Sequence, residues 1–274
     1  MNTDPLQDSL PPRYAVESDE EDELNPLEHR VREPTKVDIS IQGNIEKGGS
    51  LVVANTEIGA FWAKGAHLGE QTAAIMVNKI QVGLVFTPAW TRSTIIVSES
   101  FTRLPLSFMY PYAQKIIEAL EPTQVSILDV YSVPIYTSQN PQRIHDAPLR
   151  YLCTTESPVA SELPLFEPPN LLQTTSAAIL SISSLQSVPV TAILVPLAHV
   201  PRPAPKELLP THFLLSSEIP DQWTSSTLED AHRFLLFALQ EHSTEPWHLK
   251  GSELERLTSS RTRRTEIGEG GMYL

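Results

Sequence analysis

The chain has 274 residues, of which 41% are apolar, and it carries a formal net charge of −13. This acidity argues against nucleic-acid binding, because backbone phosphates require a basic protein surface. The single cysteine, Cys153, excludes an internal disulfide and indicates a reducing compartment, so we expect a cytoplasmic protein with nuclear access left open. No apolar run approaches about 18 residues, so we expect no membrane span and no membrane partner.

Residues 1–35 are predicted to form a disordered acidic arm. Residues 1–33 contain ten acidic and three basic side chains, which account for −7 of the net charge, and their few apolar residues show no period. Ser18 precedes a run of five acids at 19–23, a context that suits an acidophilic kinase. Ser18 is therefore a candidate phosphorylation site, and a merely solvated charge run is the alternative interpretation.

Four strands are predicted in the first half of the chain. Residues 37–41 alternate apolar and polar side chains, as a half-buried strand does. Residues 51–54 are continuously apolar, which is typical of a strand buried on both faces. Residues 80–86 and 93–97 have the composition of two further strands.

Two helix-then-strand units follow, and they determine the predicted fold class. A helical period over residues 109–120 precedes a strand at 125–130. A helix over 171–185, with Asn170 as its cap, precedes a strand at 190–195. Because a strand, a helix and a strand in this order indicate a parallel crossover, we predict an α/β domain with three layers, in which helices flank a mixed, largely parallel sheet.

A last helix is predicted over residues 227–242. It follows a proline-rich connection at 196–210 and a short apolar segment at 213–215, which suits either an edge strand or the start of a helix. Thr227 is the predicted cap, with acidic residues in the first helical turn. The apolar stripe of this helix consists of Leu228, Ala231, Phe234, Leu235 and Leu239.

The periodicity is lost from Ser243, and glycines accumulate near the end of the chain, so we predict a flexible tail over residues 243–274. The predicted organisation is thus an acidic arm over 1–35, one α/β domain over 36–242 and this C-terminal tail.

The last three residues, Met272, Tyr273 and Leu274, form a candidate docking motif. An apolar anchor, an aromatic hydroxyl and a terminal carboxylate can enter one pocket together, and capture of a C-terminal carboxylate is a recurring mode of peptide recognition. Tyrosine adds a large amphipathic contact area at a low entropic cost. A frayed terminus without a function is the alternative.

Motifs of catalysis and of cofactor binding are missing from the sequence. It contains no nucleophile elbow, no P-loop and no dinucleotide fingerprint after a strand, and Gly48-Gly49 is best interpreted as a turn. The histidines lack the spacing of a metal site, so we expect neither a metal nor a cofactor. His145-Asp146 and His199 lie in loops and could assist acid–base chemistry, whereas Cys153 is interpreted as a small hydrophobic residue. We assign no catalytic residues, and this favours a binding protein over an enzyme.

Three segments in the middle of the chain carry a resemblance to a known family. They are Pro-Leu-Phe-Glu-Pro-Pro-Asn at 164–170, Ala-Ala-Ile-Leu-Ser at 177–181 and Val-Pro-Val-Thr-Ala-Ile-Leu at 188–194. Together with the terminal Met-Tyr-Leu, this order resembles the proteasome assembly chaperone 1 family, as a divergent, fungal-type member. The order of the predicted elements resembles this family over most of residues 36–242. Similarity of the individual residues is limited to 163–197.

This resemblance implies a chaperone that promotes formation of the α-ring of the 20S proteasome core particle. The chain would act as a heterodimer with proteasome assembly chaperone 2 and would contact α-type subunits. Its Met272, Tyr273 and Leu274 would enter a pocket between adjacent α subunits, with the Leu274 carboxylate on a lysine of that pocket. The family has an α/β fold with a mixed, largely parallel sheet, which agrees with the crossover units.

Two other interpretations stay open at the level of sequence. A divergent α/β hydrolase-like or phosphorylase-like enzyme could use the same layered fold. A scaffold subunit could bind its partners through the acidic arm rather than through the C-terminal tail.

Overall fold

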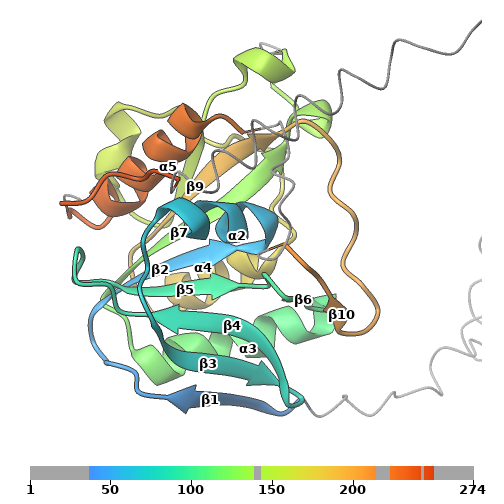
Figure 1. Cartoon of the computed structure of the whole chain (residues 1–274). Coiled ribbons are helices and arrows are strands. Elements are labelled where there is room, and N and C mark those ends of the chain that lie inside the picture. Colours follow the sequence, from blue (N-terminus) through green and yellow to red (C-terminus); the bar gives the residue numbers. More distant parts are fainter. Residues whose placement is uncertain (1–36, 139–142, 214–222, 242–243, 250–274) are drawn as a thin grey trace, which may run out of the picture. The chain divides into compact units, whose positions relative to one another are not determined.

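A mixed sheet of eight strands lies at the centre of the computed structural model, which describes residues 37–138, 143–213, 223–241 and 244–249 (Figure 1). β5, β2, β7 and β9 are parallel neighbours, and the strands on either side of this group are antiparallel. In the order of their pairing, the strands are β1 (Ile39–Gly43), β3 (Gln71–Val77), β4 (Ile80–Phe86), β5 (Thr94–Ser98), β2 (Ser50–Asn55), β7 (Gln124–Ser132), β9 (Val190–Leu197) and β8 (Arg150–Cys153).

Helices cover both faces of the sheet, so the predicted three-layer α/β fold is confirmed. α3 (Leu106–Leu120) and α4 (Thr175–Leu185) pack in one apolar cluster, and α2 (Thr56–Gly65) and α5 (Ser225–Phe237) pack in the other. Strand β2 contributes to both clusters because its side chains alternate: Leu51 lies in the first cluster and Val52 in the second. The strand is buried on both sides, as its continuously apolar sequence predicts.

The predicted caps of two helices are wrong. Helix α4 begins at Thr175 rather than at 171, and the amide group of Asn170 instead pairs with the backbone of Thr137 at 2.8 Å in both directions. Helix α5 begins two residues early, and Thr224 caps it by accepting the backbone N–H of Thr227 at 3.2 Å. The predicted apolar stripe is buried throughout, so the period identified the helix correctly, but both ends were misplaced. Helix α5 ends at Phe237 rather than at 242, and Leu239 of the stripe lies beyond it.

Several elements carry too weak a pattern to be predicted. Helix α2 contains an almost continuous run of buried residues, which hides its helical period. Strand β3 forms a hairpin with β4 through Asn78 and Lys79, both of which have positive φ. The proline-rich connection at 196–210 ends in β10 (Leu209–Pro210), which pairs with β6 (Thr102–Arg103) in a separate two-stranded sheet. Most of the apolar segment at 213–215 lies outside the described residues.

Candidate functional site

Two buried carboxyl groups lie where the parallel strands end, at the edge of the sheet where open α/β folds often bind ligands. Asp129 belongs to β7 and is 0% exposed, and Glu99 directly follows β5 and is 2% exposed. Asp129 accepts hydrogen bonds from the hydroxyls of Thr174 and Ser176 and from the N–H of Val130. The only local signal of this site in the sequence is one acid, Asp129, within an otherwise mostly apolar strand.

The first turn of α4 closes over both carboxyl groups. Thr175 donates its hydroxyl to Glu99, whose other oxygen accepts the N–H of Leu104 at 2.9 Å. Burial raises the pKa of Glu99 and of Asp129, and their hydrogen bonds oppose this effect only in part. Because the donors come from the protein itself, this cluster attaches α4 to the sheet.

The residues that could assist catalysis are dispersed. His145 and Asp146 lie in an exposed 3-10 turn, and His199 follows β9 in a loop where its carbonyl accepts the hydroxyl of Ser132. Cys153 lies on β8 and is half-buried, and burial raises the pKa of its thiol, which makes the thiolate scarce. The structure does not bring these four side chains together with the buried carboxyl groups.

The described ranges contain neither a metal site nor a helix that could span a membrane. No group of three His, Cys, Asp or Glu side chains there could hold a metal ion. Within the same ranges, each helix is too short or too polar to cross a bilayer.

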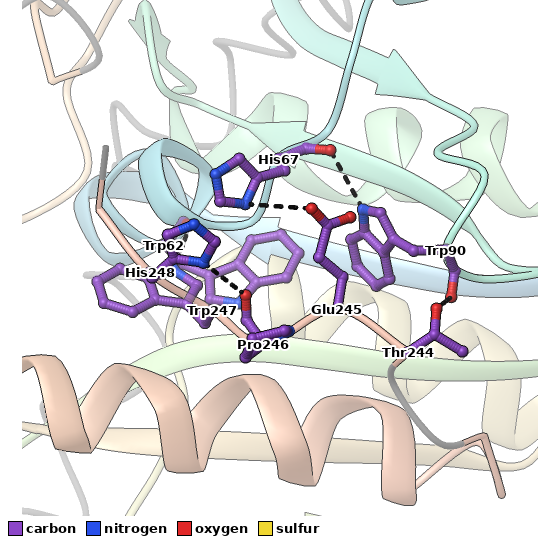
Figure 2. A network of polar contacts seen from close by, with 8 residues as sticks. All are labelled: Trp62, His67, Trp90, Thr244, Glu245, Pro246, Trp247 and His248. Carbon is purple, nitrogen blue, oxygen red and sulfur yellow. Dashed lines mark hydrogen bonds and ion pairs between the residues drawn. The ribbon is translucent and has the colours of Figure 1, made fainter. Parts of the chain in front are cut away.

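The segment 244–249 packs onto α2 and forms the root of the C-terminal tail (Figure 2). Trp247 is 2% exposed, and its indole N–H donates to the carbonyl of Trp62 at 2.7 Å. The N–H of His248 donates to the carbonyl of Gly65 at 3.1 Å. A Cβ atom at Gly65 would overlap the indole of Trp247, so this glycine is needed for close approach.

Two histidines, His67 and His232, pack against His248 and Glu245 of the root. His67 stacks on His248 with ring centroids 4.3 Å apart, and its Nδ1 lies 4.0 Å from the carboxylate of Glu245. His232 of α5 is 3% exposed, lies against the rings of Trp62 and Trp90, and hydrogen-bonds the backbone of Glu245. Burial lowers the pKa of His232 to about 4, because the charged imidazolium is poorly solvated there.

The root lies at the edge of the sheet where the parallel strands begin. Helix α2 starts after β2 and packs back along β2, β5 and β7, so its last turn lies at that edge. Glu241 accepts hydrogen bonds from the hydroxyls of Thr91 and Ser93, just before β5, and Gln124 at the start of β7 donates to the carbonyl of Leu239. Leu249, the last described residue, therefore lies near the edge of the sheet where the parallel strands begin, whereas the buried carboxyl groups lie where these strands end.

Most exposed large apolar side chains of the described residues lie on connecting loops, at the start of α3 or on β10. In Figure 1, the β6–β10 pair and the end of α5 lie at opposite ends of the sheet. Of the large apolar side chains that are exposed in the described ranges, only Ile80 and Leu185 lie elsewhere. We call the others the apolar edge: Leu106, Tyr110, Ile135, Ile144, Leu165, Leu171, Val200 and Leu209.

The residues that the sequence singles out for docking, Met272, Tyr273 and Leu274, lie outside the described residues, as does Ser18. The packed segment 244–249 falls within the predicted flexible tail and is not predicted from its sequence. One signal was present, since an isolated tryptophan in a polar, aperiodic stretch is expected to find a buried partner.

Comparison with known proteins finds relatives by structure only. No protein-family model matches the sequence, and no curated protein matches it significantly. PbaA of Pyrococcus furiosus, described as an archaeal homolog of proteasome-assembly chaperone, matches with a TM-score of 0.50 at 9% identity, over 84% of this chain and 90% of that chain. The two proteins share a fold.

Two further solved structures have lower scores. PbaB of Pyrococcus furiosus, described as an archaeal proteasome activator, has a TM-score of 0.49 at 9% identity, over 85% of this chain and 99% of that chain. A proteasome-assembly chaperone homologue of Mycobacterium tuberculosis has a TM-score of 0.40 at 9% identity, over 81% and 97% of the two chains.

Gly65→Ala is expected to detach the root from α2. The added methyl overlaps the Trp247 indole, and overpacking of this kind costs about 1–3 kcal/mol. Hydrogen–deuterium exchange should show faster exchange of the His248 amide, while strands β2 and β7 keep their protection. Gly49→Ala is the matched control, because a Cβ atom there meets open space. Unchanged exchange at residues 244–249 in Gly65→Ala would contradict the role of Gly65.

His232 is expected to make the domain less stable as the pH falls from about 6.5 to about 4. The unfolded chain binds the proton near pH 6.5 and the folded chain only near pH 4, so acid favours unfolding in this window by up to about 3 kcal/mol. His232→Gln removes the titration and keeps a donor for Glu245.

The free energy of unfolding should be measured by urea titration between pH 4 and pH 8. The buried carboxyl groups have the opposite effect, because a raised pKa makes the folded chain the better proton acceptor, but they are common to both proteins and cancel in the difference. If the free energies of unfolding of wild type and His232→Gln differ by the same amount at pH 6.5 and at pH 4, the titration of His232 does not affect stability.

Proposed function

We propose that the chain is a subunit of a proteasome-assembly chaperone that promotes α-ring formation. The observation that carries this proposal is the fold shared with PbaA. The middle segments at 164–194 and the terminal Met-Tyr-Leu, which resemble the proteasome assembly chaperone 1 family, support it independently of the fold. In this proposal the protein acts as a binding protein and has no catalytic step.

The C-terminal tail inserts Met272, Tyr273 and Leu274 into a pocket between adjacent α-type subunits of the 20S core particle. Met272 fills an apolar wall, Tyr273 stacks and donates its hydroxyl, and the Leu274 carboxylate pairs with a lysine of the pocket. The packed root supports this arrangement because it fixes the point from which the tail departs. A chain from Leu249 to Met272 that behaves as a flexible coil spans roughly 25–30 Å at about 5–6 Å × √n.

The apolar edge is the proposed surface for the heterodimer with the homologous chaperone, proteasome assembly chaperone 2. Leu106 is 68% exposed, Ile135 is 62% exposed and Leu171 is 78% exposed, although all three lie on loops or helix ends that follow core elements. Apolar side chains concentrated at one edge are typical of a surface that another protein covers. The surface lies away from the root, so a partner bound there leaves the tail free.

The enzyme alternative lacks an open site at the carboxyl groups. Asp129 and Glu99 are buried and hydrogen-bonded within the chain, and neither lines the cavity beside β7. A general acid or base must be within hydrogen-bond reach of a substrate, and α4 occupies that position. The geometry therefore favours a role of the cluster in stability.

Tyr273→Ala is expected to weaken binding to 20S particles by about 10–100-fold, because the aromatic ring is the largest contact in the motif. Binding should be measured by surface plasmon resonance with purified 20S core particles and half-assembled α-rings. Deletion of Met272–Leu274 should abolish the tail contribution, and Tyr273→Phe should retain most of it. Equal affinities of the full chain and of the deletion variant would refute tail docking.

Leu106→Glu and Ile135→Glu are expected to prevent copurification with a co-expressed homologous chaperone partner, because each places a charge within the proposed apolar interface. Glutamate at the first residue of α3 is favoured by the helix dipole, so the domain should still fold. Leu185→Glu is the matched control, since Leu185 is 81% exposed at the other end of α4. Normal copurification of both edge variants would place the heterodimer interface elsewhere.

A further inference from the structure

A cavity of about 510 Å³ opens between the end of β7 and the start of β8, on the segments 131–138 and 143–150. Its lining includes three basic side chains, Arg143, His145 and Arg150, and no acidic side chain. In a chain with a net charge of −13, such a local excess of bases requires an explanation. The cavity is separate from the C-terminal root and from the buried carboxyl groups, so this inference does not depend on the proposed function.

Arg150 is the buried charge of this cavity. The residue is only 5% exposed, its Nη1 donates to the carbonyl of Leu165 at 2.9 Å, and its Nε has no hydrogen-bond partner in the described part of the chain. The guanidinium carbon lies 4.3 Å from the ring centroid of Tyr136 and 5.8 Å from that of Tyr131. Cation–π contacts, the carbonyl of Leu165 and a hydrogen bond with the side chain of Tyr131 compensate the lost hydration of a guanidinium only in part.

Among the described residues, no carboxylate lies within 4.0 Å of the guanidinium of Arg150 or of Arg143. The acid nearest to His145 in sequence, Asp146, does not line the cavity. Residues 139–142, which lie outside the described residues, contain no acid in their sequence. Buried charges in proteins are normally paired, so the cavity has the chemistry of a site for an anion that is not among the described residues.

The remaining walls are apolar or aromatic. Tyr131 and Tyr136 form one side, and Val133, Pro134 and Ile144 add aliphatic surface. The hydroxyl of Tyr131 is held by the carbonyl of Pro148 at 2.7 Å, and that of Tyr136 accepts the N–H of Glu167 at 3.1 Å. Both rings are thereby fixed and present carbon surface, which suits an apolar ligand body.

We propose that this cavity binds a small organic anion. A carboxylate or phosphate group would lie against Arg150 with Arg143 and His145 at the opening, and an aromatic or aliphatic body would pack on Tyr131 and Tyr136. Both kinds of ligand carry an oxyanion on an apolar body, and the experiment below distinguishes the carboxylate from the phosphate.

The test uses the full chain and four probes in isothermal titration and saturation-transfer NMR. Benzoate and phenyl phosphate carry the proposed chemistry, benzamide is the neutral analogue of benzoate, and benzylamine is the cationic one. Benzoate, phenyl phosphate or both should bind, at least about tenfold more tightly than benzamide and benzylamine, because a charge-assisted hydrogen bond is lost with the neutral head group. Whichever anion binds more tightly identifies the head group.

Two variants localise the site. Arg143→Ala changes an exposed side chain and should weaken anion binding several-fold in a folded protein. Arg150→Lys retains the charge but removes the planar fork, and should weaken it by about tenfold. Arg92→Ala, on an exposed arginine outside the cavity, is the matched control and should bind as wild type.

The inference is overturned if benzamide binds as tightly as benzoate, if neither anion binds, or if Arg143→Ala binds the anions as wild type does. The last comparison remains decisive even where Arg150→Lys fails to fold.

Discussion

The burial of the Asp129 carboxyl group is the constraint on which the middle of this fold depends. A carboxyl group at the end of a core strand is costly unless donors surround it, and the donors are the hydroxyls of Thr174 and Ser176. Asn55 at the end of β2 joins them through Ser176, and Glu99 after β5 receives Thr175. Three parallel strands are therefore fastened to one helical turn by side-chain hydrogen bonds, which fixes where α4 must start.

This arrangement determines what the chain between β7 and α4 can do. The chain between β7 and α4 returns to the sheet as the edge strand β8, and its other residues line the cavity beside Arg150 and form part of the apolar edge. In many α/β folds the same edge of the sheet is open to ligands. Here the surface available for binding is displaced to the loops, and this agrees better with recognition of a partner than with chemistry at the strand ends.

Much of the fold could be predicted from the sequence because burial on two faces leaves a strong local pattern. The apolar runs at β2 and β9 and the stripe of α5 are examples, and each appears where it was expected. What could not be predicted depends on contacts between distant residues. Asn170 has the residue type of a helix cap, but its side chain pairs with the backbone of Thr137, 33 residues away, and also donates to the nearby carbonyl of Glu167.

The site was less predictable than the fold for the same reason. Trp247 stands in a stretch without a period, and its burial depends on the space left by Gly65, which no local rule connects to it. Arg150 lies in a loop-rich region, and its burial without an ion pair to the described residues is visible only once the chain is folded. Periodicity reports burial along one element, whereas a site is defined by elements that are remote in sequence.

The root changes the interpretation of the C-terminal tail in one specific respect. If the tail began at Ser243, about 30 residues would precede Met272, whereas departure from Leu249 leaves about 23, and effective concentration scales roughly as the −3/2 power of length. The resulting gain is only about 1.5-fold, too small to matter for affinity. What the anchor by Trp247 does determine is position: it fixes the exit at the edge of the sheet where the parallel strands begin, away from the apolar edge. If the proposed heterodimer forms through that apolar edge, Leu249, the last described residue, lies at the edge of the sheet opposite to the partner.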